Sequence, residues 1–185
     1  MLPAGAKITS EILWWGALIL AAIDAGFVSI LAWRINLATF RRFKWALTST
    51  SAIFWCALWT WGLTTFWDSI YHYVFPAWAH WLIPPIFGLL YAGTSLLFWW
   101  LALRFGGNAL INFCLLGGLW GMLTHLLGVY LGIVNKPPAL QGAAPAAAVV
   151  FAVFEFIFYW CTILSVSTLA HTVLERLRQA SVQIE

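Results

Sequence analysis

Charged residues are scarce in this chain. Of its 185 residues, 9 are lysine or arginine and 6 are aspartate or glutamate, which together make up 8% of the sequence. A soluble domain carries roughly 25% charged residues, because its surface must be wetted by water. The scarcity excludes an ordinary soluble domain. It also leaves no basic stripe, so nucleic acid is not expected as a partner.

Cys-x-x-Cys pairs, hydrolase motifs and transporter repeats are missing as well. The three cysteines lie inside apolar runs with no Cys-x-x-Cys spacing. Such cysteines are predicted to be small buried hydrophobes that give no information about the redox compartment. No motif supports a serine or cysteine hydrolase. No internal repeat or broken helix of the kind that transporters use is evident.

Long apolar runs, by contrast, dominate the chain. Hydrophobic residues make up 63% of the sequence, and the mean hydropathy is +0.90. Each run is near the roughly 20 residues that a helix needs to cross the hydrocarbon core, and none alternates as barrel strands do. The sequence therefore predicts an all-α, polytopic transmembrane bundle in a single domain over residues 1–185, located in the inner or plasma membrane. The five predicted helices span residues 12–33, 45–67, 81–104, 108–134 and 146–174.

Basic residues predict the orientation of these helices. Positive residues gather in the cytoplasmic loops of membrane proteins. Lys7 and Lys136 fall on one predicted side, and all other basic residues fall on the opposite side. The N-terminus is therefore expected outside and the C-terminus in the cytoplasm. The residues on the predicted cytoplasmic side are Arg34, Arg41, Arg42, Lys44, Arg104, Arg176 and Arg178.

Tryptophan and glycine add detail to the predicted packing. Most of the 14 tryptophans lie near the ends of apolar runs, where indole rings anchor helices at the interface. Small residues on the fourth predicted helix should let a neighbouring helix approach closely; these are Gly117, Gly118, Gly121, Gly128 and Gly132. The tryptophans expected to lie deeper, between helices or around a cavity, are Trp55, Trp59, Trp61, Trp120 and Trp160.

Ionisable residues inside the predicted spans are costly and hence functional candidates. Asp24 lies near the middle of the first span, His125 lies on the fourth and Glu155 on the fifth. His125 and Glu155 fall at about the same depth, so they could form a hydrogen-bonded pair. Asp24 with these two residues could also form a proton or ion pathway. A bis-histidine haem is not favoured, because His125 has no histidine partner at matched depth.

The densest group of candidates lies in and around the second predicted loop. Asp68 and His72 are four residues apart, so a helical turn would place them on one face. Pro76 then permits a reversal that could bring His80 towards that face. One carboxylate and two imidazoles form a ligand set suited to zinc, copper or iron. Tyr71, Tyr73 and Glu155 could hydrogen-bond to these ligands, with His125 and Asp24 as further candidates. The alternative is that Asp68 caps or pairs with His72 while His80 anchors the interface.

This segment resembles a known metal motif. Asp68-x-x-x-His72, followed by a proline-containing turn and His80, is similar to the Asp-x-x-x-His…His motif in the C subunit of the copper membrane monooxygenases, which oxidise methane and ammonia. The resemblance covers only about residues 67–81, and the two histidines are closer together here than in that family. It implies a copper or zinc ion held by Asp68, His72 and His80.

Two functions remain open from the sequence. The first is a membrane protein with a metal site near the outer face, which, if catalytic, would act on a small or lipophilic substrate by redox or hydrolytic chemistry. The second is a non-catalytic structural or accessory subunit of a larger membrane complex that contacts pigment or lipid. The expected partners are the lipid bilayer and either other membrane subunits or further copies of the chain.

Overall fold

Helices make up nearly all of the part of the chain that the structure describes. The computed structural model describes residues 10–63, 72–73, 78–130, 134–135 and 144–182. Its helices are α1 (Ser10–Arg34), α2 (Leu37–Arg42), α3 (Lys44–Trp61), α5 (Ala79–Arg104), α6 (Ala109–Tyr130) and α7 (Pro145–Val182). Two two-residue strands, β1 (His72–Tyr73) and β2 (Val134–Asn135), pair with each other. The predicted all-α class is confirmed. Three of the helices, α1, α5 and α7, are long and apolar enough to cross a membrane.

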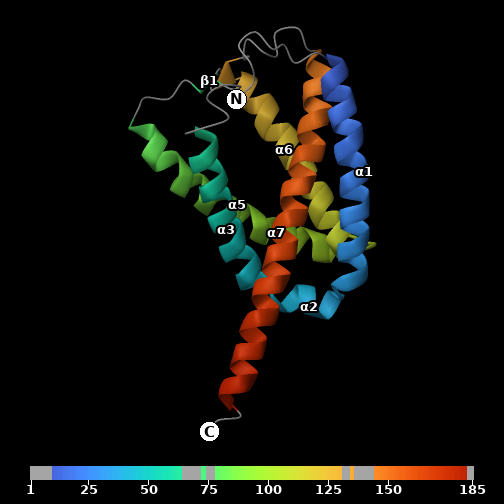
Figure 1. The fold of residues 1–185 in the computed structure, drawn as a ribbon, viewed down its shortest axis with the longest axis vertical. Coiled ribbons are helices and arrows are strands. Elements are labelled where there is room, and N and C mark those ends of the chain that lie inside the picture. Colours follow the sequence, from blue (N-terminus) through green and yellow to red (C-terminus); the bar gives the residue numbers. More distant parts are fainter. Residues whose placement is uncertain (1–9, 64–71, 74–77, 131–133, 136–143, 183–185) are drawn as a thin grey trace.

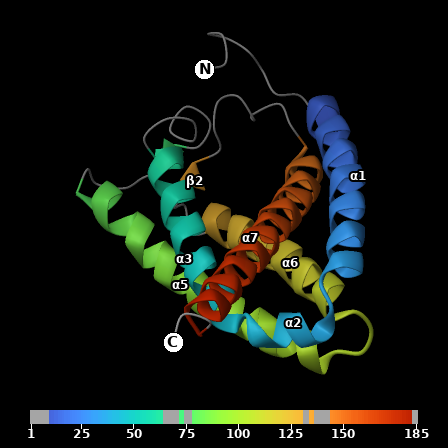
Figure 2. The same ribbon diagram turned by 60° about the horizontal axis from the view of Figure 1, so that its bottom comes forward.

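Helix α7 lies at the centre of the bundle. It contacts α1, α3 and α6, while α3 and α5 form a second extensive contact. Figures 1 and 2 show α7 between α1 and α3, with α6 crossing behind it. α1 and α7 run in the same direction, and the Ser10 hydroxyl at the start of α1 accepts a 2.6 Å hydrogen bond from the Ala144 N–H beside the start of α7. The first and last helices are therefore neighbours.

Glycines bring α6 and α7 into close contact. A Cβ at Gly117 would lie 2.0 Å from Cδ1 of Trp160, and one at Gly121 would lie 2.1 Å from Cγ of Phe156. Gly118 faces Ile157 in the same way, with a 2.6 Å approach. The predicted role of these three glycines is confirmed, because any side chain there would overlap α7. Gly132 lies outside the described residues, and the role of Gly128 stays a prediction.

Aromatic side chains fill the interior. Trp55 of α3 stacks on Tyr91 of α5 with ring centroids 4.0 Å apart and planes 16° apart, and it lies 5.9 Å from Trp160. Trp55 and Trp160 are both buried, as predicted. The prediction for Trp61 is wrong, because this side chain is 52% exposed. Trp61 is the last residue of α3 and follows the exposed Thr60.

The basic end of the bundle is closed by the short helix α2. Asn36 caps α2 by accepting a 2.8 Å hydrogen bond from the Thr39 N–H. The Trp99 indole of α5 donates a 3.1 Å hydrogen bond to the Phe40 carbonyl of α2. At this end, Lys44 lies 5.5 Å from the ring centre of Trp45, and Arg104 lies 4.1 Å from that of Trp100. The segments that connect the helices at this end are short, and the helix ends beside them carry the basic residues.

The ends of α6 and α7 differ from the predicted ones. α6 ends at Tyr130, and Val134 belongs to β2 rather than to the helix. α7 continues to Val182, eight residues past the predicted end at residue 174. Leu174, Glu175, Arg176, Leu177 and Arg178 are good helix formers, and no glycine or proline follows Pro145 in α7, so nothing stops the helix there.

Candidate functional site

Two of the three predicted metal ligands, His72 and His80, belong to described segments. β1 and β2 form an antiparallel pair in which His72 is opposite Asn135 and Tyr73 is opposite Val134. This pairing joins the segment before α5 to the segment after α6 (Figure 1). His80 lies in the first turn of α5 and is half-buried. Asp68 and Tyr71 lie outside the described residues.

His125 and Glu155 come from two helices that pack against each other. Because Gly117 meets Trp160 and Gly121 meets Phe156, α6 and α7 run antiparallel, and the turn that carries His125 lies within about one turn of the level of Glu155. The Tyr159 hydroxyl, one turn further along α7, donates a hydrogen bond to the Glu155 carboxylate. The expected similar depth of His125 and Glu155 agrees with this register. Their hydrogen-bonded pairing stays a prediction, because the side chain of His125 lies outside the described part.

Asp24 is the most unusual ionisable residue in the described part of the chain. It lies in α1, is only 3% exposed, and neither carboxyl oxygen has a hydrogen-bond partner among the residues that the structure describes. A buried polar group without a partner loses its hydration and gains nothing in return. The sequence correctly singled out Asp24 as costly, and the structure adds that no described neighbour offsets this cost.

A pair of cysteines, which the sequence analysis treated only as hydrophobes, meets across the interface between α6 and α7. The Cys161 thiol lies 3.5 Å from the Cys114 sulphur, and both side chains are buried. A signal for this contact existed in the sequence. Cys114, Gly117, Gly118 and Gly121 follow the i, i+3, i+4, i+7 spacing of one helix face, which is the face that contacts α7.

The described residues contain no cluster of metal-ligating side chains. Within residues 10–63, 72–73, 78–130, 134–135 and 144–182, no three His, Cys, Asp or Glu side chains come together in a way that could hold a metal ion. Cys114, Cys161 and Asp24 therefore do not form such a site. The set of Asp68, His72 and His80 stays a prediction, because Asp68 and the side chain of His72 lie outside the described residues.

Comparisons with known protein families, with curated protein sequences and with solved structures each find no match to this chain.

Proposed function

We propose that the chain is a five-span membrane protein, with its N-terminus outside and its C-terminus in the cytoplasm, that holds a copper or zinc ion at its extracytoplasmic end. Asp68, His72 and His80 would be the ligands.

The apolar outer surface supports membrane insertion. Large hydrophobic side chains are exposed along α1 and α5, among them Ile19, Trp33, Trp81 and Leu89. α3 and α6, with 18 and 22 residues, complete the five. At about 1.5 Å per residue they extend about 27 and 33 Å, close to the roughly 30 Å of a hydrocarbon core.

The distribution of charge supports the orientation. Arg34 ends α1, Arg41 and Arg42 lie in α2, and Arg104 ends α5. All of these belong to the end of the bundle that α2 closes, and the C-terminal part of α7 leaves from the same end (Figure 1). Basic residues on one side mark that side as cytoplasmic.

One observation carries the site proposal. The backbone of His72 is paired with Asn135, so the segment that precedes α5 is held to the segment that follows α6. This pairing lies at the end of the bundle where α5 begins, and His80 lies in the first turn of α5. β1, which contains His72, and the first turn of α5, which contains His80, thus lie at the end opposite the basic residues. One carboxylate and two imidazoles suit copper or zinc. A bound ion would supply redox or Lewis-acid chemistry for a small or lipophilic substrate.

Metal analysis of the purified protein tests the site. Wild type should carry a stoichiometric transition metal, and an Asp68→Ala/His72→Ala variant should lose it. His171→Ala is the matched control, since His171 lies at the opposite end beside Phe43, with ring centroids 6.0 Å apart; it should keep the metal. Metal-free wild-type protein, after purification without chelators and incubation with copper or zinc, would rule the site out.

A non-catalytic role in a membrane assembly is the second candidate. The observation that favours it is the projection of α7 beyond the bundle, with every residue from 172 to 181 exposed. Such a helix offers a surface to another protein without taking part in a reaction. Isolation from native membranes in mild detergent tests this role, because a subunit should migrate as part of a larger defined complex.

A further inference from the structure

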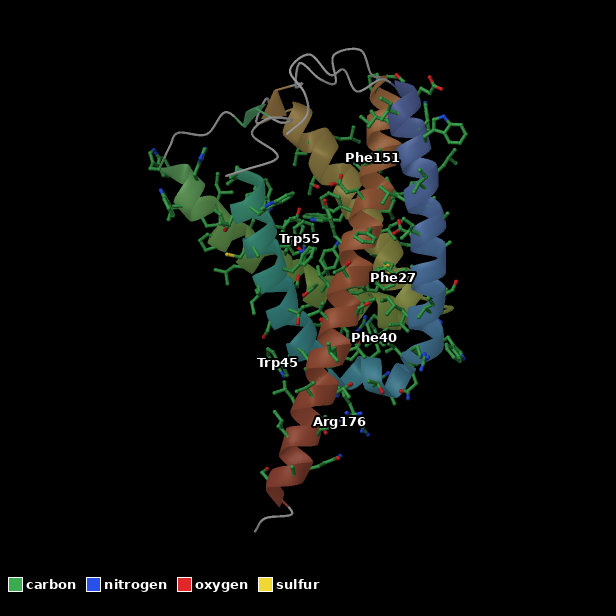
Figure 3. The ribbon with its side chains drawn as sticks, viewed as in Figure 1. Phe27, Phe40, Trp45, Trp55, Phe151 and Arg176 are labelled. Carbon is green, nitrogen blue, oxygen red and sulfur yellow. The ribbon has the colours of Figure 1, made fainter. Side chains whose placement is uncertain are left out.

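The C-terminal part of α7 extends past every other helix. α7 has 38 residues, or about 57 Å at 1.5 Å per residue, whereas a hydrocarbon core is about 30 Å thick. His171 still contacts the bundle through Phe43. Beyond it, residues 172–181 are exposed, and Arg176 lies on the part of α7 that has passed α2 (Figure 3). We call residues 172–181 the α7 extension.

An apolar stripe runs along one face of α7 and into this extension. Apolar residues recur there at alternating spacings of four and three, at Val166, Ala170, Val173, Leu177 and Ala180. The stripe is flanked by Leu169 and Leu174, which are 65% and 61% exposed. The bundle-facing side of α7 carries the buried Leu164, which at 100° per residue points well away from the stripe. The other faces of the extension are polar, with Thr172, Glu175, Arg178 and Gln179.

The membrane surface cannot cover this stripe. A helix bends sharply only at proline, at glycine or at a local defect in its hydrogen bonds. α7 is one continuous helix with no glycine, and its single proline is at its first residue. The extension therefore continues in the direction of the span and points away from the bilayer, so Val173, Leu174 and Leu177 would stand in water unless a protein covers them.

The pattern and the geometry both fit a second copy of the same chain. A 3.5-residue apolar repeat is the signature of two helices wound around each other. Copies of one membrane protein share one orientation, so neighbouring extensions point the same way and can pair in parallel. In that register Leu169 lies beside Leu174 of the second copy, and Arg176 lies beside Ser181 of the second copy. No like charges therefore face each other along the seam.

We propose that the α7 extension pairs with the same segment of a second copy, in parallel and in register. The inference rests on the membrane placement proposed above but not on the metal site. The whole stripe, from Val166 to Ala180, is only about two heptads long, but confinement to one membrane raises the effective concentration of the two segments. The exposed Val166 and Leu169 continue the contact into the spanning part of α7.

Disulfide cross-linking in native membranes tests the register. In a Cys56→Ala background, in which Cys114 and Cys161 stay buried, Leu177→Cys should form a disulfide-linked dimer upon mild oxidation. Glu175→Cys lies on the polar side and is the matched control; it should cross-link several-fold less. Equal cross-linking of the two variants, or none by Leu177→Cys, would overturn the proposal.

Charge placed on the stripe tests its contribution to association. Wild type should be dimeric by light scattering in mild detergent, and Leu177→Glu should be monomeric. Gln179→Glu adds the same charge on the polar face and should stay dimeric. Circular dichroism checks that both variants keep their helices. A monomeric wild type, a dimeric Leu177→Glu, or a monomeric Gln179→Glu would each count against the seam. Metal content should be the same in wild type and both variants, so failure of the metal site and failure of this pairing give separate results.

Discussion

The Trp160 indole of α7 lies against Gly117 of α6 so closely that a Cβ at Gly117 would be 2.0 Å from Cδ1 of the ring. Trp160 is fully buried and also contacts Phe113, with ring centroids 5.4 Å apart. The indole therefore has little room to withdraw. This contact joins the central helix to α6 at the level of Cys114 and Cys161.

Gly117→Ala should destabilise the bundle. The added methyl overlaps Trp160, and overpacking of a filled core costs typically about 1–3 kcal/mol. The measurement is the free energy of unfolding in detergent, followed by circular dichroism. Gly93→Ala on α5 is the control, because nothing lies within 4 Å of a Cβ placed there. If the two variants unfold alike, the close contact between α6 and α7 is wrong.

Asp24→Leu should raise stability. The carboxyl is buried without a partner among the described residues, and an unsatisfied buried polar group costs about 1–3 kcal/mol. Leucine has the same number and branching of side-chain heavy atoms as aspartate, and it removes that cost. Thermal unfolding of the detergent-solubilised protein measures the change, with Asp24→Asn as a polar comparison. A large loss of stability in Asp24→Leu would show that the carboxyl has a partner that must be retained.

Trp99→Phe should weaken the attachment of α2. The substitution removes the 3.1 Å hydrogen bond from the indole to the Phe40 carbonyl, and such a bond contributes about 0.5–1.5 kcal/mol. The neighbouring Trp100→Phe is the control, because Trp100 is exposed and lies beside Arg104. Chemical denaturation should separate the two variants. Equal midpoints would show that this hydrogen bond contributes nothing.

Cysteine labelling should establish the orientation. In the Cys56→Ala background, Gln179→Cys should react with an impermeant maleimide only after the cytoplasmic side is opened. Ala139→Cys, between the fourth and fifth predicted spans, should react in intact cells. The reverse pattern would invert the proposed topology, and labelling of both positions from one side would contradict a crossing of the membrane by α7 between them.

Local sequence was sufficient wherever a single helix decided the outcome. The apolar runs predicted helices close to α1, α3, α5, α6 and α7, because a lipid-facing helix satisfies its backbone hydrogen bonds within itself. Gly117, Gly118 and Gly121 were recognised as a packing face for the same reason, since their spacing is a property of one helix. The fifth predicted span ends at residue 174, where the apolar run ends, whereas α7 itself continues to Val182.

Composition and periodicity thus determined the class of the fold, the helical segments and the costly carboxyl of Asp24. Only the tertiary structure decided that α1 lies beside α7, that Cys114 meets Cys161 at 3.5 Å, and that Trp61 faces outwards while Trp55 and Trp160 are buried. The physical reason is that hydrophobicity specifies whether a segment is apolar. In a chain that is apolar on nearly every face, it does not specify which face meets another helix. That choice depends on the fit between helices far apart in the sequence.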